Sequence, residues 1–135
     1  MTRPQFYGAP GLSDRYHMSH VVRVGSHVEL SGQGGIDVDG NAPDALEDEI
    51  AAAFDNVGRR LATAGARWHD VYSIVSYHVP SAADADGLHH HVPIMVANMR
   101  RALPDRHPIW TCVGVATLGE PQMRVEIAVA AHVTD

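Results

Sequence analysis

The sequence predicts an α/β (α+β) fold with the element order β-β-α-β-α-β-β, whose five strands belong to an expected six-stranded mixed sheet with two helices on one face. Short β-branched runs bounded by Gly or Pro indicate the strands. Two longer segments, whose apolar residues recur every three or four positions, indicate the helices. The sequence shows no internal repeat, linker or low-complexity tract, so we expect residues 1–135 to form one domain.

The first strands form a predicted hairpin. Residues 1–19 are rich in Gly, Pro and Ser without a sustained period, and we expect extended or loop structure there. Two β-branched runs, 20–24 and 27–31, flank Gly25 and Ser26, which is the pattern of a β-hairpin with a two-residue turn. The glycines that follow, from Gly32 to Gly35, end the second strand.

A helix is expected next. Asp44, with Glu47 three residues later, has the spacing of a capping box. Gly65 suits the left-handed residue that follows a helix. The apolar stripe between these ends consists of Leu46, Ile50, Ala53, Phe54, Val57, Leu61 and Ala64.

The C-terminal half alternates strand and helix. Residues 71–79 read as a strand that ends at Pro80. Residues 82–103 have helical spacing with Pro93 inside, so this helix either kinks there or begins its regular part nearby. The remaining elements are a strand at 109–115, a turn at 117–122 and a long strand at 123–133.

Two of these strands are apolar at too many consecutive positions for a sheet with one solvated face. They cover residues 73–79 and 127–133. We therefore expect a self-association surface on the sheet, most simply in a closed ring of identical subunits.

Composition narrows the functional classes. The formal net charge of −6 argues against binding of nucleic acid, which requires a clustered basic face. The longest apolar runs fall short of the roughly 20 residues of a membrane span, and residues 1–10 lack the apolar region of a signal peptide. Cys112 is the single cysteine, which excludes an internal disulfide and a thiolate-rich zinc site. We expect a cytoplasmic protein without membrane or nucleic-acid partners.

Short sequence pieces add a family resemblance. In order, they are Val-Arg-Val-Gly at 22–25, Leu-Ser-Gly-Gln at 30–33, Phe-Asp-Asn-Val at 54–57, Ala-Gly-Ala at 64–66, Asp-Val at 70–71, residues 108–115, and Val-Glu-Ile at 125–127 with Ala130. With these pieces the chain resembles the RidA/YjgF family of reactive-intermediate deaminases, from about Tyr16 to Ala131. The resemblance implies a RidA/chorismate-mutase-like fold and a homotrimer with a barrel-like core and three ligand clefts between neighbouring subunits.

The resemblance also implies a site. Deaminases of this family use a glutamate on the last strand to position the water that hydrolyses an imine or enamine, and Glu126 matches it. Their arginine, which anchors a substrate carboxylate, is replaced here by Trp110 within the stretch Pro-Ile-Trp-Thr-Cys-Val at 108–113. An arginine fork contributes about 1.5–3 kcal/mol per charged hydrogen bond, whereas an indole offers one donor and an apolar face. Trp110 therefore favours a substrate other than a simple 2-imino acid.

Further ligand contacts follow from the same resemblance. The family's tyrosine near the first strand matches Met18 best, with Tyr16 two residues away. Arg124 is two positions from Glu126 and is expected on the same strand face, where it either replaces the missing arginine or, as we favour, pairs with Glu126 or a neighbouring subunit. The remaining expected contacts are Ser31, Gly32, Thr111 and Cys112.

Several residues have a plain structural interpretation as well. Glu126 is either a structural partner of a basic group or a general base whose pKa burial raises. Trp110 is also a candidate core aromatic, and Cys112 is expected to be an inert strand thiol rather than a nucleophile. His78 and His107 are weaker acid–base candidates.

Three consecutive histidines, 89–91, suggest a metal site at first sight. On a helix their side chains point about 100° apart and do not jointly bind one ion. We expect solvated or interface histidines, no metal and no cofactor, although one of the three is able to reach the cleft.

Three functions remain open from the sequence. The first is hydrolysis of an imine, an enamine or a related intermediate. The second is different chemistry in the same cleft, such as ring hydrolysis, tautomerisation or cyclisation of a pathway intermediate. The third is a non-catalytic small-ligand-binding or chaperone-like protein.

Overall fold

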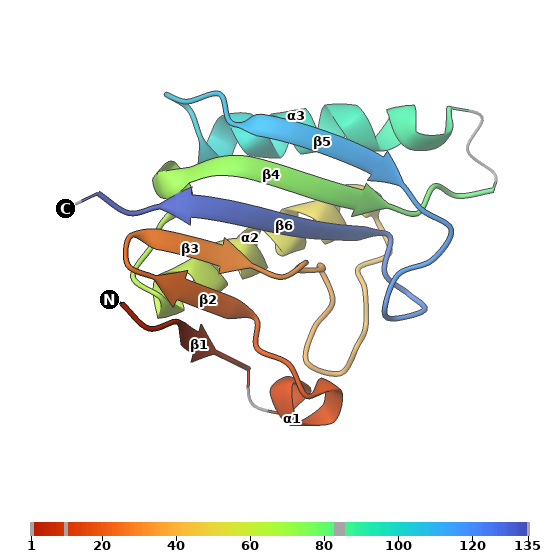
Figure 1. The fold of residues 1–135 in the computed structure, drawn as a ribbon. Coiled ribbons are helices and arrows are strands. Elements are labelled where there is room, and N and C mark those ends of the chain that lie inside the picture. The colour runs from red at the N-terminus through yellow and green to blue at the C-terminus, as the bar shows by residue number, and fades with distance from the viewer. Residues whose placement is uncertain (1, 10, 83–85, 135) are drawn as a thin grey trace.

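A computed structural model describes residues 2–9, 11–82 and 86–134, and within these ranges it contains one mixed sheet of six strands in the order β1-β2-β3-β6-β4-β5 (Figure 1). Neighbouring strands are antiparallel except β4 and β5, which are parallel. The strands are β1 Gln5–Tyr7, β2 Val21–Val24, β3 His27–Leu30, β4 Val71–His78, β5 Ile109–Gly114 and β6 Val125–His132. The predicted six-stranded mixed sheet is confirmed: five strands follow the predicted element order, and the sixth, β1, comes from the N-terminal segment expected to be extended or loop.

The N-terminal segment contains more structure than its sequence indicates. Besides β1 it forms a short helix, α1 Leu12–Tyr16. Elements of three and five residues are too short to display a period, which explains why the segment reads as extended or loop. The predicted hairpin is confirmed, with Gly25 at φ 61° in its turn between β2 and β3.

The first long helix, α2 Leu46–Thr63, begins without the expected capping box. The prediction for Asp44 and Glu47 is wrong, because the N-cap residue is Ala45 and no side chain caps the helix. The carbonyl of Asp44 instead accepts a hydrogen bond from Arg124. At the other end Gly65 has φ 75°, as predicted for the residue that follows the helix.

The second long helix, α3 His91–Ala102, follows a 3₁₀ turn, η2 Gly87–His90; another 3₁₀ turn, η1 Trp68–Asp70, precedes β4. Pro93 lies in the first turn of α3, where its missing N–H would have no partner within the helix. The prediction that the regular helix begins near Pro93 is confirmed. Residues 83–85 of the predicted helix lie outside the described residues.

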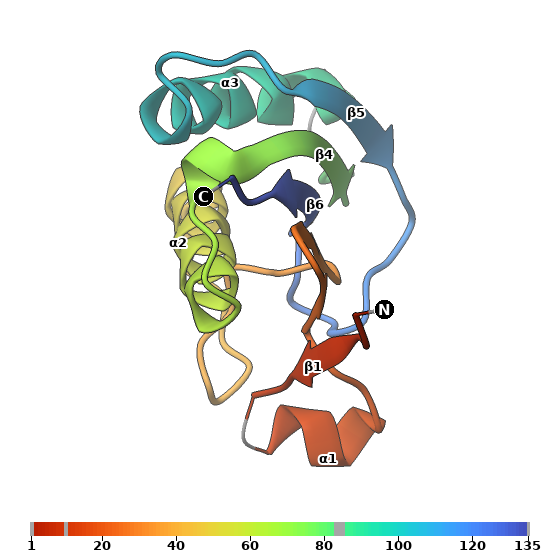
Figure 2. The ribbon, with the colours of Figure 1, turned by 60° about the vertical axis from the view of Figure 1, so that its left-hand side comes forward.

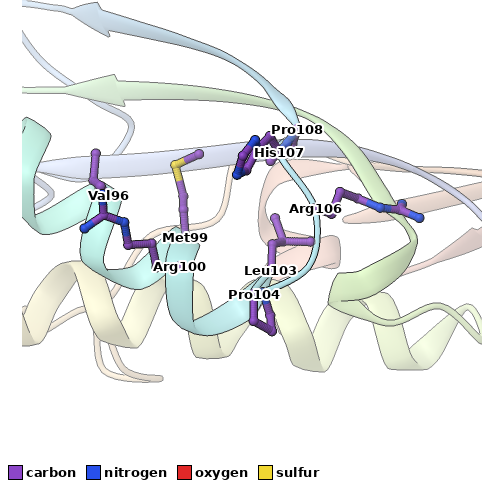
Figure 3. A pocket seen from close by; sticks show the side chains of 8 residues that line it. All are labelled: Val96, Met99, Arg100, Leu103, Pro104, Arg106, His107 and Pro108. Atoms are coloured by element: carbon purple, nitrogen blue, oxygen red, sulfur yellow. The ribbon is translucent and has the colours of Figure 1, made fainter.

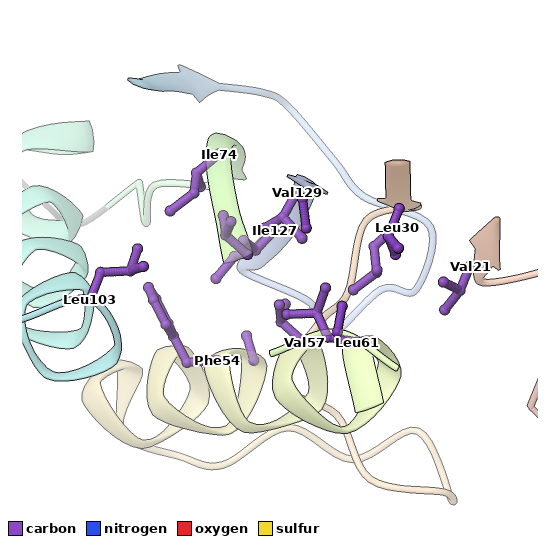
Figure 4. Close-up of a cluster of buried hydrophobic side chains, with 14 of the residues drawn as sticks. Val21, Leu30, Phe54, Val57, Leu61, Ile74, Leu103, Ile127 and Val129 are labelled. Carbon is purple, nitrogen blue, oxygen red and sulfur yellow. The ribbon is translucent and has the colours of Figure 1, made fainter. Parts of the chain in front are cut away.

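The core lies between α2 and the sheet. Figure 4 shows Phe54, Val57 and Leu61 of α2 pointing toward Ile127 and Val129 of β6. These side chains belong to one buried apolar cluster. Each contributes about 1.5–3 kcal/mol by leaving water, so the cluster fixes which face of β6 points inward.

The opposite face of the sheet carries no helix among the described residues, as Figure 2 shows with α2 and α3 together on one side. Phe6 and Ile109, whose strand partners Val22 and Ser73 place them on this open face, are 66% and 70% exposed. The expected self-association through the open face stays a prediction. In the described ranges no helix combines the length and apolar character of a bilayer span.

Candidate functional site

Glu126 lies on the open face of the sheet. It is opposite Tyr77 of β4, while its neighbours Val125 and Ile127 are buried on the helix side. The side chain is half-buried, and among the described residues it has no hydrogen bond or ion pair. Burial raises the pKa of this carboxyl. An unpaired carboxylate with a raised pKa is a stronger base than an exposed one.

Gly32 lies directly against this carboxyl. A Cβ at Gly32 would clash with Cγ and Oε1 of Glu126, so a larger residue there would displace the carboxyl. Next to it, the Ser31 hydroxyl is 3.4 Å from the carbonyl of His20 and accepts a hydrogen bond from Nε2 of Gln33 at 3.3 Å. The structure therefore brings one of these two predicted contacts, Gly32, to Glu126, whereas the Ser31 hydroxyl bonds to Gln33, whose side-chain oxygen accepts a hydrogen bond from Arg60 of α2.

Trp110 lies on the opposite face from Glu126 within one chain. It pairs with Ile74 of β4, whose side chain is buried in the core, and its own indole packs against that core. Cys112 pairs with Ser76 and therefore points to the same helix side. A site that contains both Glu126 and Trp110 thus requires these residues to come from different copies of the chain.

A buried chain of hydrogen bonds runs behind Trp110. Its indole Nε1–H donates to Ser76 Oγ at 2.9 Å, and Ser76 Oγ lies 2.8 Å from Nε2 of His78. The Nδ1 atoms of His78 and His91 are 3.0 Å apart. Ser76, His78 and His91 have almost no exposed surface. This hydrogen-bonded chain connects β5, β4 and the first residue of α3.

Two side chains that adjoin Ser76 are uncharged at neutral pH. Burial, and then the neighbouring His91, lower the pKa of His78 to about 4. Burial raises the pKa of the Cys112 thiol, an effect that a hydrogen bond from Ser76 partly opposes. His78 and Cys112 are therefore a neutral imidazole and a neutral thiol at pH 7.

Acidification is expected to destabilise the fold through His78. Its folded pKa of about 4 lies below the ordinary value of 6.5, so the unfolded chain binds a proton first as the pH falls. The loss begins below pH 6.5 and approaches about 3 kcal/mol near pH 4. Urea unfolding at several pH values, compared with His78→Gln, measures it. An equal pH dependence in both proteins would contradict the prediction, because the comparison cancels the contributions of the groups that do not contact His78.

Arg124 does not pair with Glu126 as expected. Its Nε donates to Oε1 of Glu49 at 2.6 Å, its backbone N–H donates to Oε2 of the same carboxylate at 2.7 Å, and its Nη2 donates to the carbonyls of Pro43 and Asp44. Glu49 is fully buried in α2. The expected pairing with Glu126 is wrong, because Arg124 precedes β6 and its side chain reaches across to the helix. Its guanidinium is already occupied and is not a substitute anchor for a substrate carboxylate.

The remaining predicted contacts lie on different parts of the surface. The Tyr16 hydroxyl, at the end of α1, donates to Glu120, which raises the pKa of Tyr16. Met18 is exposed in the segment between α1 and β2. Thr111 is exposed on the open face, since it pairs with Val75, so it shares the face of Glu126.

The three consecutive histidines diverge. His89 and His90 are exposed in η2, whereas His91 points into the buried chain with His78. Of the described residues, no three His, Cys, Asp or Glu side chains are grouped so that they could bind a metal ion.

A cavity of about 550 Å³ lies at the C-terminal end of α3, away from these residues (Figure 3). Val96, Met99 and Leu103 supply apolar surface, and Arg100 and His107 add polar groups. The cavity contains none of the predicted ligand contacts, although His107 was an acid–base candidate.

Ser76 and the link between His78 and His91 were not predicted as parts of a site. The signal was present in β4, where Ile74, Ser76 and His78 alternate with outward residues. Two polar residues on the inward face of an otherwise apolar strand require buried partners.

Comparisons with known proteins agree on the fold. Residues 9–133 match the family model described as endoribonuclease L-PSP. The RutC family protein YjgH of Escherichia coli (strain K12) is 27% identical over 120 residues, which are 89% of this chain and 87% of YjgH. The solved structure of YjgH superposes with a TM-score of 0.81 at 25% identity and covers 100% of this chain and 99% of its own.

Two further solved structures share the fold. A member of the YjgF/YER057c/UK114 family from Mycobacterium tuberculosis has a TM-score of 0.79 at 20% identity, covering 97% of this chain and 100% of its own. RidA from a Psychrobacter species has a TM-score of 0.75 at 22% identity, covering 95% and 94%.

Proposed function

Because the chain belongs to the endoribonuclease L-PSP (YjgF/RidA) family, we propose that it is a small-molecule hydrolase that acts on an imine or an enamine, with Glu126 as the general base. The observation that carries the proposal is the state of this carboxylate. It is half-buried against Gly32, has a raised pKa and lacks a partner among the described residues. Carboxylates that are buried for structural reasons are normally paired or hydrogen-bonded.

The chemistry requires one proton acceptor and one water. Glu126 takes a proton from water while the water oxygen bonds to the carbon of the C=N group and the C=N electron pair moves to the nitrogen, which then receives this proton back from Glu126. In the resulting tetrahedral intermediate the same carboxylate passes the hydroxyl proton to the nitrogen, the C–N bond breaks, and ammonia and a carbonyl compound leave. An enamine enters the same sequence after protonation at carbon to give the imine.

The complete site includes residues from two copies of the chain in this proposal. Glu126 and Thr111 lie on the open, apolar face, and β5, which carries Trp110, is an edge strand of the sheet. An exposed edge and an apolar face are surfaces on which a second copy can pack. A homotrimer would close three such contacts and form three equivalent clefts.

The substrate class in the proposal is a planar compound without a carboxylate. On the side of Trp110 the neighbouring side chains Ser76, His78 and Cys112 are neutral at pH 7. Arg124, the nearest cation in sequence to Glu126, is bound to Glu49. An indole face favours an apolar ring over a charged group. The same face also favours the second candidate, in which the reacting group belongs to a ring that is hydrolysed or isomerised.

The proposal also covers compartment and partners. RNA is not the proposed substrate, despite the name of the family model, because the chain has a formal net charge of −6. A cytoplasmic location is proposed on the single cysteine, Cys112, which is a free thiol here.

A pair of imines of different charge tests this function. Benzaldimine, generated from benzylamine by an amine oxidase, is compared with 2-iminopropionate, generated from alanine by an amino-acid oxidase, with semicarbazide as the competing trap. We expect the protein to accelerate hydrolysis of benzaldimine at least about tenfold more than that of 2-iminopropionate, because Trp110 replaces the arginine expected for the carboxylate and Arg124 is bound to Glu49. Trp110→Arg is expected to reverse the preference.

The outcomes separate the candidates. If neither imine is hydrolysed faster than in buffer, the hydrolase proposal is wrong, and benzaldehyde binding without turnover would then favour a non-catalytic binding protein. If 2-iminopropionate is the faster substrate, the proposed substrate class is wrong while the hydrolase proposal stands.

A further inference from the structure

The hydrogen-bonded chain behind Trp110 has no evident role in packing. Ser76, His78 and His91 occupy inward positions of β4 and α3, beside the apolar core residues Ile74 and Met95. Desolvation of two imidazoles and a hydroxyl costs free energy, and apolar side chains of similar volume would fill the same space. The polar side chains therefore need a purpose other than filling the core.

Two hydrogen bonds of this group meet at Ser76 Oγ. The indole nitrogen of Trp110 is a donor only, so Ser76 Oγ must accept its hydrogen. The Ser76 hydroxyl has one proton of its own, and two arrangements of the remaining protons satisfy the chain. In one, the hydroxyl donates to Nε2 of His78 and Nδ1–H of His78 donates to His91. In the other, both imidazoles donate toward Ser76, and the hydroxyl proton turns to Cys112.

Both arrangements leave the same bond in place. Whichever way the protons point, Ser76 Oγ accepts from Trp110, because an imidazole always occupies its other side. A serine hydroxyl without such a neighbour would rotate among three staggered positions. His78 removes that freedom, and His91 in turn orients the imidazole of His78.

We propose that Ser76, held by His78 and His91, is the positioning residue for Trp110, fixing the indole as a rigid planar wall of the ligand site. The inference rests on the proposed function only in assigning a ligand to that wall. Trp110 is half-buried on an edge strand, where an unbonded indole would be free to change rotamer. A fixed ring has little conformational entropy left to lose, so the binding of a planar ligand costs less free energy. The chain also ties the start of α3 to the site, since His91 is the first residue of that helix.

The exchange rate of the indole N–H with solvent reports this bond directly. In protein labelled with ¹⁵N-tryptophan, NMR resolves the indole N–H groups of Trp110 and Trp68. The indole of Trp68 donates to the carbonyl of Phe54 and stacks on its ring, so it serves as an internal reference for the intact fold. The measurement does not depend on catalysis, and it therefore separates this inference from the hydrolase proposal.

In Ser76→Ala we expect Trp110 indole exchange to accelerate at least about tenfold while Trp68 exchange stays unchanged. Ser76→Thr keeps a hydroxyl at this position and is expected to keep Trp110 exchange slow. Ser73→Ala removes a hydroxyl from the opposite face of β4 and is expected to change neither rate.

Unchanged Trp110 exchange in Ser76→Ala, or exchange that is equally fast in Ser76→Thr, would overturn the positioning role. Should Ser76→Ala accelerate both indoles by loosening the fold, His78→Gln takes its place, with faster Trp110 exchange and unchanged Trp68 exchange supporting the role and unchanged Trp110 exchange overturning it.

Discussion

Replacement of Glu126 by glutamine is expected to reduce imine hydrolysis by about 100-fold to 10,000-fold, the range that a positioned general base contributes. The amide has nearly the shape of the carboxylate but does not accept a proton from water. Because Glu126 has no partner among the described residues and burial disfavours its ionised form, the neutral amide is not expected to weaken the fold. Activity is therefore lost while thermal stability is kept.

The measurement is the hydrolysis rate of benzaldimine together with the melting temperature of each variant. Glu47→Gln supplies a matched control, since Glu47 is an exposed glutamate in the first turn of α2. The control is expected to keep its rate. If Glu126→Gln retains a rate within about threefold of the original protein, Glu126 is not the base, because even the lowest typical contribution of a base is about 100-fold.

A pH profile adds a second readout of the same carboxylate. General-base catalysis requires ionised Glu126, so the rate falls as the pH drops through its pKa. Since burial raises that pKa above its ordinary value, the acid limb is expected at higher pH than an exposed glutamate would give. Glu126→Gln is expected to lose this limb along with the rate.

Local patterns predicted most of the fold. The hairpin of β2 and β3, the helix α2 and the start of α3 near Pro93 all follow from periodicity and turn residues within a few positions of each other. The failure at Asp44 has a tertiary cause, since its carbonyl is taken by Arg124 from 80 positions away. No pattern near residue 44 records that contact.

The arrangement of the site depends on pairing between distant strands. Alternation along β5 shows that Trp110 and Cys112 share a face, and alternation along β6 gives the face of Glu126. Only the pairing of both strands with β4 shows that these two faces are opposite. Family resemblance suggests one cleft, whereas the register places Trp110 and Glu126 on opposite faces of the sheet within one chain.

Strand alternation does not predict the direction of the Arg124 side chain. This residue precedes the first residue of β6, so strand alternation does not govern its direction, and its long side chain reaches the buried carboxylate of Glu49. Glu49 itself lies in the acidic first turn of α2, and its side chain points inward. The sequence shows an acid in that turn and a basic residue just before the last strand. Their proximity is set only by the packing of α2 on the sheet.

Truncation of Glu49 to alanine is expected to cost about 3–5 kcal/mol of stability, because it leaves the Arg124 guanidinium at a partly buried position without its counter-charge. The carboxylate also accepts the backbone N–H of Arg124 at 2.7 Å, and that donor loses its partner as well. Unfolding by urea, with a constant m-value, gives the change in free energy. Glu47→Ala, at an exposed position of the same helix turn, is expected to cost less than about 1 kcal/mol.

Joint replacement of the pair distinguishes an uncompensated charge from lost packing. Glu49→Leu combined with Arg124→Met removes both charges and keeps much of the buried volume, so it is expected to recover part of the loss. Recovery is incomplete because the backbone N–H at position 124 remains unbonded, at a cost of about 1–3 kcal/mol. If the double variant is no more stable than Glu49→Leu alone, the stranded guanidinium is not the source of the lost stability. Since position 124 immediately precedes β6, the same series shows whether Glu126 depends on this pair: a lower hydrolysis rate in folded Glu49→Ala would mean that the ion pair holds the start of the strand on which the base is placed.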